Sequence, residues 1–272
     1  MLRVDLHIHS RFSDSSKTIE EVMKEADEKN IDYISFVDHD TTETIDYVRK
    51  IQDKFKVRVL PGVEISAYDF KRKRKVHILC YNYRKTDHIE SICSELLDRR
   101  NKNSMAQIYK LTELGYEIDK DKLIRSINSK RTLYKQHIMD YICDYDFNDE
   151  RYTKLYKSLF KNGGPLQMDI EYVDAFDALK ACLLDGGIPV LAHPGELDSF
   201  EIAEELAKEG LKGIEVEHFS HSPEDVERAK DLAKKYDLIQ TSGSDDHGRF
   251  GKKADMGYEV LEDSHIERLI SD

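Results

Sequence analysis

The sequence has few cysteines, and none of them has the spacing of a paired metal-binding or disulfide motif. The four are Cys80, Cys93, Cys143 and Cys182, which lie far apart and never form a CxxC pair. This spacing argues against a structural zinc knuckle and against a disulfide framework. We interpret the four thiols as buried apolar fillers in a protein of a reducing compartment.

Long apolar runs are also absent. No stretch approaches the roughly 20 apolar residues that a membrane-spanning helix needs. The first residues lack the succession of charged, apolar and small side chains that is typical of a secretory leader. We therefore expect no membrane partner, and a cytoplasmic location is the default expectation.

Positive charge is scarce relative to negative charge. The chain carries 42 lysines and arginines against 54 acidic residues, which gives a formal net charge of −12. This balance argues against a duplex-DNA binder that works by broad phosphate neutralisation. A small anionic substrate remains compatible with it, because bound divalent cations reverse the local field. At 272 residues, 39% hydrophobic and 35% charged, the chain fits a globular protein of one large or two small domains.

The first ten residues, MLRVDLHIHS, alternate apolar and polar side chains from Val4 onward. A period of two predicts a β-strand and puts His7 and His9 on the same face, roughly 6–7 Å apart. Two imidazoles at that separation can reach a single metal ion. A half-buried strand whose polar face happens to carry two histidines would give the same pattern.

Strand and helix patterns alternate at both ends of the chain, which predicts a parallel sheet, open or closed into a barrel. The later strands are predicted at 32–37, 57–66, 76–83, 188–192, 213–217, 239–242 and 258–261. The segment 86–186 is charged and dominated by helical patterns, with no convincing strand. We therefore predict a barrel domain formed by 1–85 and 187–272, with 86–186 inserted as a helical cap.

Side chains that can bind a metal recur at the carboxyl ends of the predicted strands, the rim at which active sites form in such folds. They are His7, His9, His39, Glu64, His193, Asp245 and His247. His88 and His265 fall outside this pattern and are predicted to lie at the surface. Imidazole and carboxylate groups together suit zinc, iron or manganese. With Asp14 and His77 the set reaches nine, enough for three ions that share a bridging carboxylate and perform metal-assisted hydrolysis.

Seven motifs resemble those of the PHP family, which is named for bacterial polymerases and histidinol phosphatases. In chain order they are DLHIHSRFSD, SFVDHD, LPGVEIS, VHILCY, VLAHPGE, GIEVEHFSHSP and TSGSDDHG. The resemblance implies an α/β fold, a distorted (β/α)₇ TIM-like barrel with a metal cluster at its carboxyl rim. It also implies a metal-dependent phosphoesterase.

The resemblance further implies how the ligands are shared between two or three divalent ions (Mn, Fe or Zn). The first ion would be held by His7, His9, Glu64 and Asp245, with Asp245 preferred to Asp246 because the family pattern is Asp-x-His. Glu64 would bridge to a second ion, also held by His77 and His193. Asp14, His39 and His247 would hold a third. The expected nucleophile is a hydroxide that bridges the ions beside Glu64.

Within the family, the chain most resembles stand-alone phosphoesterases that carry a helical insertion. Members of that branch act on nucleoside 3′,5′-bisphosphates or trim short oligonucleotides from the 5′ end. Their insertion usually has an Arg-Pro-His-Ile-like segment that meets the substrate phosphate. Here the nearest equivalent begins at Lys135, and Arg131 is the second candidate cation. His137 either contacts substrate or packs its helix, and His218 either faces the substrate or makes a structural hydrogen bond.

The expected activity is hydrolysis of a phosphomonoester of a nucleotide-like substrate, such as a nucleoside 3′,5′-bisphosphate. A close variant of this activity is a 5′–3′ exonuclease on short RNA or DNA. A non-catalytic metal-binding regulatory module and an amidohydrolase-type C–N hydrolase are the competing hypotheses from different functional classes. The basic run at 71–75 is either a solvated turn between strands or an electrostatic guide for a polyanion.

Overall fold

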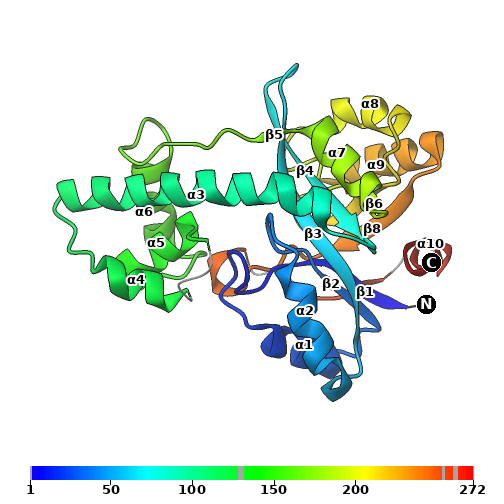
Figure 1. Ribbon diagram of the computed structural model, residues 1–272, viewed down its shortest axis with the longest axis horizontal. Coiled ribbons are helices and arrows are strands. Elements are labelled where there is room, and N and C mark those ends of the chain that lie inside the picture. The colour runs from blue at the N-terminus through cyan, green and yellow to red at the C-terminus, as the bar shows by residue number, and fades with distance from the viewer. Residues whose placement is uncertain (1, 128–131, 253–254, 260–262, 272) are drawn as a thin grey trace.

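The computed structural model describes residues 2–127, 132–252, 255–259 and 263–271 (Figure 1). The strands are β1 (Arg3–Ile8), β2 (Tyr33–Phe36), β3 (Arg58–Asp69), β4 (Arg74–Tyr81), β5 (Val173–Asp174), β6 (Ile188–Leu191), β7 (Gly213–His218), β8 (Ile239–Gly243) and β9 (Tyr258–Glu259). The helices are α1 (Ile19–Glu28), α2 (Glu43–Ile51), α3 (Asp87–Glu113), α4 (Lys120–Ser126), α5 (Lys135–Ile142), α6 (Glu150–Phe160), α7 (Ala175–Leu184), α8 (Ala203–Lys208), α9 (Pro223–Tyr236) and α10 (Asp263–Ile270), and the short 3₁₀ turns are η1 (Gln52–Lys54), η2 (Phe200–Ile202) and η3 (Gly248–Phe250).

The strands form a nearly closed barrel, which confirms the predicted fold. They pair in the order β8-β7-β6-β4-β3-β2-β1-β9, and β5 adds to the side of β3. The barrel closes where β1 meets the end of β8: the amide of Asp245 donates to the carbonyl of His7 at 2.7 Å, and the amide of His9 donates to the carbonyl of Asp246 at 3.1 Å. The closure brings the first strand against the segment that follows the eighth.

The sequence predicts parallel strands throughout, but β4 runs antiparallel to both of its neighbours, β3 and β6. Residues 70–73 alone separate β3 from β4, whereas a parallel crossover needs about a dozen residues or more. The turn is built by Asp69, whose carboxylate accepts hydrogen bonds from the amides of Lys71 and Arg72, and by Lys73 in a left-handed conformation. Because β4 runs in the reverse direction, its first residues lie at the rim where the sequence predicts the metal ligands.

Helices α3 to α6 make a cap with an apolar core of its own, distinct from that of the barrel. The 27-residue helix α3 connects the two (Figure 1). Its first half packs Ile89 and Leu96 into the barrel core, and its second half packs Ile108 and Leu111 into the cap core. The cap is therefore anchored to the barrel by a continuous helix.

Two elements within the predicted cap segment lie on the barrel instead. Strand β5 pairs with β3, although the sequence predicts no strand between 86 and 186. Helix α7 packs Ala178, Leu179 and Cys182 into the barrel core. Two-residue strands such as β5 have no periodicity from which a sequence could predict them. The exact limits of the cap, 86–186, remain a prediction.

Several smaller expectations are also tested. Cys80, Cys93 and Cys182 are buried, as predicted, while Cys143 is half-buried, and all four are free thiols. His88 is exposed, as predicted, but His265 is buried against β8 and accepts a hydrogen bond from the amide of Gln240 at 3.4 Å. The surface prediction for His265 is wrong because α10 turns that face toward the barrel.

Within the described residues, no helix combines the length and apolarity that a membrane crossing requires.

Candidate metal centre

The nine predicted ligands meet at one end of the barrel. Three of them lie on strands: His7 on β1, Glu64 on β3 and His77 on β4. His9 directly follows β1. The loops after β1, β2, β6 and β8 supply the other five, which are Asp14, His39, His193, Asp245 and His247. Their ligand atoms form overlapping groups in which every atom lies within 4.8 Å of the others. One group is His9, Asp14, His39 and His247, a second is His7, His193 and Asp245, and two more contain Glu64. The assignment of ligands to individual ions remains a prediction.

Glu64 stands at the centre of the cluster. Its Oε1 lies 2.6 Å from Nδ1 of His77 and 2.9 Å from Nε2 of His193. Its Oε2 lies 3.1, 3.2 and 3.4 Å from ring nitrogens of His39, His9 and His7, respectively. A buried carboxylate within reach of five imidazoles has the geometry of a ligand shared between ions.

Several buried polar atoms of the cluster have no hydrogen-bond partner. Among the predicted ligands they are Nε2 of His7, Nε2 of His9, Oδ1 of Asp14, Nδ1 of His39, Oε2 of Glu64, Nδ1 of His193 and Nδ1 of His247. Buried polar groups are normally paired, because leaving one unpaired costs about 1–3 kcal/mol. Imidazole nitrogens and carboxylate oxygens gathered without partners fit divalent ions such as zinc, iron or manganese.

The electrostatics of the cluster lead to the same conclusion. Burial alone would raise the pKa of the Glu64 carboxyl, but the imidazoles of His39, His77 and His7 hold that pKa well below its usual range. Burial lowers the pKa of the His193 imidazole, yet its hydrogen bond to Glu64 reverses the direction and raises the pKa to about 9. The carboxylates thus stay ionised and need positive charge beside them. Divalent ions bound to the imidazoles in place of protons would supply that charge.

The backbone at the rim is unusual at two predicted ligands and at one glycine. His193 and Asp245 have φ angles of 21° and 49°, in the left-handed region that costs a non-glycine residue conformational energy. Gly243 ends β8 against β1, where a Cβ would lie 2.1 Å from Cβ of His7. The glycine in TSGSDDH therefore allows the two strands to approach closely enough to bring Asp245 beside His7.

Sequence reasoning missed Glu215, a fully buried carboxylate on β7. It accepts hydrogen bonds from Nδ1 of His7 at 3.1 Å and from the amide of His193 at 2.8 Å. Burial raises its pKa, but the charge of His7 outweighs that effect and lowers the pKa to about 2. An ionised carboxylate there fixes the His7 tautomer so that Nε2 faces the cluster. An acidic residue inside the apolar run GIEVEH was the signal available in the sequence.

Replacing Glu215 by glutamine is expected to weaken metal affinity by about 10–100-fold, the usual cost of losing a carboxylate that orients a metal-binding histidine. The variant keeps the shape of the side chain but loses the charge that orients His7. Competition with a metal chelator measures the change. Glu217→Gln, two residues along the same strand and partly exposed, is the matched control. Equal affinities in the two variants would contradict the role assigned to Glu215.

The loop that carries Asp14 is held by Asp38, a second buried carboxylate that the sequence did not single out. It accepts hydrogen bonds from the amide and hydroxyl of Ser10, the amide and hydroxyl of Ser13, and the hydroxyl of Thr44, at 2.6–3.1 Å. Five donors on one carboxylate fix the serine-rich loop after β1. Asp14 is thereby placed 3.2 Å from Nδ1 of His247.

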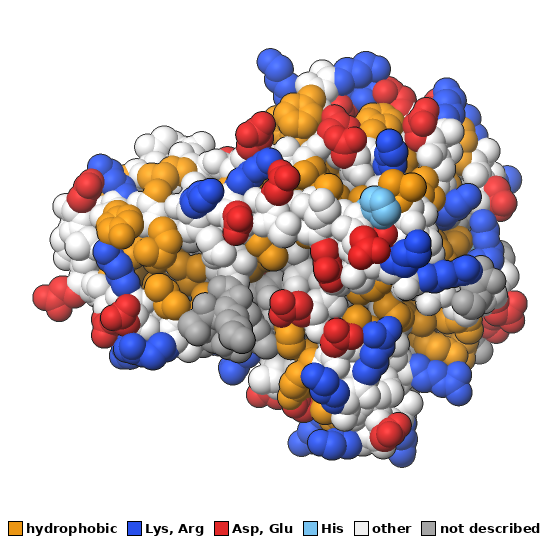
Figure 2. All heavy atoms as spheres, viewed as in Figure 1, with side chains coloured by type: hydrophobic (Ala, Val, Ile, Leu, Met, Phe, Trp, Pro, Cys, Tyr) orange, Lys and Arg blue, Asp and Glu red, His pale blue; other side chains and the backbone are white. Residues whose placement is uncertain are grey.

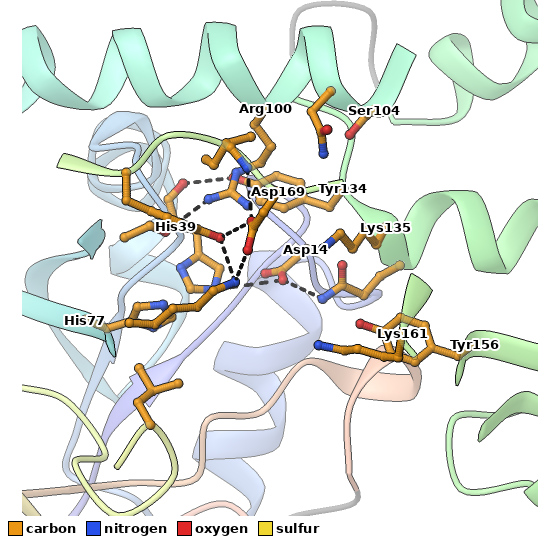
Figure 3. Close-up of a pocket in the computed structure, with 17 residues that line it drawn as sticks. Asp14, His39, His77, Arg100, Ser104, Tyr134, Lys135, Tyr156, Lys161 and Asp169 are labelled. Carbon is orange, nitrogen blue, oxygen red and sulfur yellow. Dashed lines mark hydrogen bonds and ion pairs between the residues drawn. The ribbon is translucent and has the colours of Figure 1, made fainter. Parts of the chain in front are cut away.

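A cavity of about 290 Å³ lies between the ligand cluster and the cap (Figure 3). Asp14, His39 and His77 line its barrel side, and Lys135, Tyr156 and Lys161 line its cap side. The cap therefore covers one side of the predicted metal-binding rim.

Arg100 of α3 joins cap and barrel at the edge of this cavity. Its guanidinium lies 3.0 Å from Oδ2 of the buried Asp40 and 3.1 Å from the hydroxyl of Ser66. It also stacks over the ring of Tyr134, 4.9 Å from the centroid, and the Tyr134 hydroxyl donates to the carbonyl of His39 at 3.0 Å. Sequence reasoning missed both residues, which tie the cap to the metal-binding rim.

A family model described as the PHP domain matches residues 5–219 of this chain. The chain belongs to the PHP family. Its match to a phosphoribosyl 1,2-cyclic phosphate 1,2-diphosphodiesterase of Eggerthella lenta is 42% identical and covers 94% of this chain and 98% of that protein. A 3′,5′-nucleoside bisphosphate phosphatase of Chromobacterium violaceum is 25% identical, with 95% of this chain and 92% of that protein covered.

Solved structures show the same fold. One from Bifidobacterium adolescentis, described as a metal-dependent phosphoesterase, superposes with a TM-score of 0.88 at 24% sequence identity. The superposition covers 98% of this chain and 95% of the Bifidobacterium chain. The resemblance stated from the sequence motifs is thus confirmed. This PHP protein is a metal-dependent phosphoesterase, and the predicted hydrolase class is confirmed with it.

The predicted substrate residues of this PHP protein differ in where they lie relative to the cavity. Lys135 lines the cavity, and Arg131 lies outside the described residues. His137 does not line the cavity: its Nδ1 accepts a hydrogen bond from the amide of Tyr134, which caps helix α5, and its ring packs on Phe250. Of the two roles predicted for His137, substrate contact and helix packing, the structure shows the contacts of helix packing.

His218 lies at the edge of the ligand cluster. Its Nδ1 pairs with the hydroxyl of Ser220 at 2.6 Å, and its Nε2 lies 3.5 Å from Asp245 without a hydrogen-bond partner. Glu196, His218 and Asp245 form a further group whose ligand atoms lie within 4.8 Å of one another. The side chain thus makes a structural hydrogen bond with one nitrogen and faces the site with the other.

The basic run at 71–75 is largely neutralised within the protein. Lys71 and Arg72 pair with Glu205, Arg74 pairs with Asp198, and Lys75 pairs with Asp169. Figure 2 shows cationic and acidic side chains interspersed over the visible face of the molecule, without a broad patch of one sign. These ion pairs fit the solvated-turn interpretation of the run.

Proposed function

We propose that this protein hydrolyses a phosphoester of a small phosphorylated ribose at the cluster centred on Glu64. The observation that carries the proposal is the set of unpartnered imidazole and carboxylate atoms that converge on Glu64. Two or three divalent ions held there would lower the pKa of a bridging water and stabilise charge on the phosphoryl oxygens. Three ions would use all nine predicted ligands.

The chain's own residues orient the predicted ligands and place a cation near them. Glu215 and Asp38 hold His7 and the Asp14 loop in place. Tyr134 anchors the backbone of His39 to the cap. The cap forms one side of a cavity of about 290 Å³, where Lys135 places a cation within reach of an anionic substrate. A charge-assisted hydrogen bond between Lys135 and a substrate anion would be stronger in a partly enclosed site than in bulk water.

The relatives favour a ribose that carries two phosphoryl groups. The protein that is 42% identical is named for a phosphoribosyl cyclic phosphate, and the one that is 25% identical is named for nucleoside bisphosphates. We therefore place phosphoribosyl 1,2-cyclic phosphate ahead of the nucleoside 3′,5′-bisphosphate expected from the sequence. The 5′–3′ exonuclease is the second candidate, since a curated relative at 23% identity carries that name. A cavity of about 290 Å³ favours a small molecule over a polymer.

The test compares three substrates on the manganese-loaded enzyme: phosphoribosyl 1,2-cyclic phosphate, adenosine 3′,5′-bisphosphate and a labelled short oligonucleotide. We expect the cyclic phosphate to be opened fastest, with products identified by mass spectrometry. His9→Ala, which removes one predicted ligand, controls for contaminating activity. Preferential cleavage of the oligonucleotide would favour the exonuclease, and no product above the His9→Ala background would overturn the proposal.

Substrate binding is expected to weaken as the pH rises through about 8. Burial lowers the pKa of the Lys135 ammonium to about 8; Asp169 raises it, and the cations Lys75, Lys161 and Arg100 lower it further. Below that pH the side chain is charged and holds the substrate anion, and above it the charge is lost. We expect KM to rise about tenfold between pH 7 and 9, as for a lost charge-assisted hydrogen bond.

Lys135→Arg is the control for this pH dependence, because a guanidinium stays charged throughout the range. Its KM should stay flat where that of the wild type rises. A wild-type profile and a Lys135→Arg profile that rise in parallel would assign the pH dependence to another group.

A further inference from the structure

Helix α5 of the cap contacts a predicted metal ligand directly through Gln136. The side-chain Nε2 of Gln136 donates a hydrogen bond to Oδ2 of Asp14 at 2.8 Å. The other carboxylate oxygen of Asp14, Oδ1, is buried without a hydrogen-bond partner and lies 3.2 Å from Nδ1 of His247. One oxygen of Asp14 is therefore fixed by the cap, and the other is left for the group of ligand atoms that it forms with His9, His39 and His247.

The same helix contacts the segments that carry His39 and His247. Tyr134, the N-cap residue of α5, donates from its hydroxyl to the carbonyl of His39 at 3.0 Å. Arg249, two residues after His247, forms an ion pair with Asp140 of α5. Together with the hydrogen bond to Asp14, these contacts connect α5 to three of the four ligands in the group, which come from three different loops of the barrel.

The barrel itself orients a second group of predicted ligands, His7, His193 and Asp245. Glu215 of β7 accepts hydrogen bonds from the ring of His7 and from the amide of His193. The amide of Asp245 donates to the carbonyl of His7. These contacts come from the strands and their ends, without α5. The two groups of ligands are therefore held by different parts of the chain, one by the barrel alone and one by the barrel together with the cap.

We propose that Gln136 is a positioning residue for the ion predicted at Asp14, His39 and His247, and that it couples this ion to the cap. The inference rests on the proposed function, because it takes the same cluster to bind divalent ions. Carboxylates that bind a metal are themselves held by hydrogen bonds, and losing such a partner commonly weakens metal affinity about 10–100-fold. Coupling between two sites is reciprocal, so an ion favoured by the contact with α5 also favours that contact. Metal binding should therefore hold α5 against the rim.

Gln136→Met keeps an unbranched side chain but removes the donor to Asp14. Metal-free protein is dialysed against a series of buffered free Mn²⁺ concentrations, and the bound manganese per chain is measured by elemental analysis. We expect the binding of one ion to require about 10–100-fold more free Mn²⁺ than in the wild type, while the other ions bind unchanged. Tyr141→Phe is the matched control, since it removes a hydrogen bond that α5 makes within the cap, from the amide of Asp119 to the Tyr141 hydroxyl at 3.1 Å. It should bind manganese as the wild type does.

Hydrogen exchange followed by mass spectrometry tests the reciprocal effect. Saturating Mn²⁺ should slow amide exchange in α5 of the wild type and of Tyr141→Phe, and should slow it less in Gln136→Met. The same slowing in Gln136→Met as in the wild type would overturn the coupling between the ion and the cap.

The manganese titration also separates this inference from the proposed function. Equal manganese binding in Gln136→Met and Tyr141→Phe would overturn the inference, and so would an equal weakening of every ion, because Gln136 would then support the rim as a whole. A wild type that binds the ions as expected but hydrolyses no phosphoester would overturn the proposed function alone. A wild type that binds no manganese would overturn both.

Discussion

Replacing Glu64 by glutamine is expected to lower kcat/KM by at least about a thousandfold, which corresponds to ~4 kcal/mol of transition-state stabilisation. The Glu64 carboxylate lies within 3.4 Å of ring nitrogens from five histidines. An amide keeps the shape but loses the charge that would balance shared divalent ions. The bound metal should therefore fall together with the activity, and elemental analysis of the purified variant measures that loss.

Glu209→Gln is the control for this experiment, since Glu209 is an exposed glutamate at the end of α8. It should bind as much metal as the wild type and retain full activity. A Glu64→Gln protein with wild-type metal content and wild-type turnover would show that Glu64 is not the bridging ligand.

Replacing Arg100 by methionine is expected to lower the free energy of unfolding by about 3–5 kcal/mol, the cost of breaking a buried ion pair from one side. The change leaves Asp40 fully buried without its cation, although Asp40 still accepts a hydrogen bond from the amide of Ser66 at 2.8 Å. It also removes the stacking of the guanidinium on Tyr134. Urea unfolding followed by circular dichroism measures the loss.

The double variant Arg100→Met with Asp40→Asn separates the charge from the packing. Removing both charges should cost less than the sum of the two single changes, because neither buried charge is then left alone. Additive costs, or a loss below about 1 kcal/mol in Arg100→Met, would contradict the view that this pair joins cap to barrel.

Much of the rim was predictable because its signals are local. Alternation in MLRVDLHIHS orients His7 and His9 on one face without reference to the rest of the chain. The positions of His39, His193 and Asp245 follow from the ends of apolar strands, and the structure brings them together where parallel strands share a rim. Local periodicity and strand ends therefore carry most of the information about the candidate ligands.

The remaining features depend on partners that are distant in sequence. Glu215 meets His7 across 208 residues, and Arg100 meets Asp40 across 60. The direction of β4 depends on the turn at 70–73, which is too short for a parallel crossover and therefore makes β3 and β4 antiparallel. His137 was predicted either to contact substrate or to pack its helix, and residue type alone does not reveal that its Nδ1 accepts a hydrogen bond from the amide of Tyr134.

Anomalous diffraction from crystals of the manganese-loaded protein tests the central claim most directly. The account predicts strong peaks at the barrel rim, within coordination distance of Glu64 and of imidazoles from His7, His9 and His39. Peaks elsewhere, or no peak at the rim in crystals of an enzyme that hydrolyses phosphoesters, would contradict it.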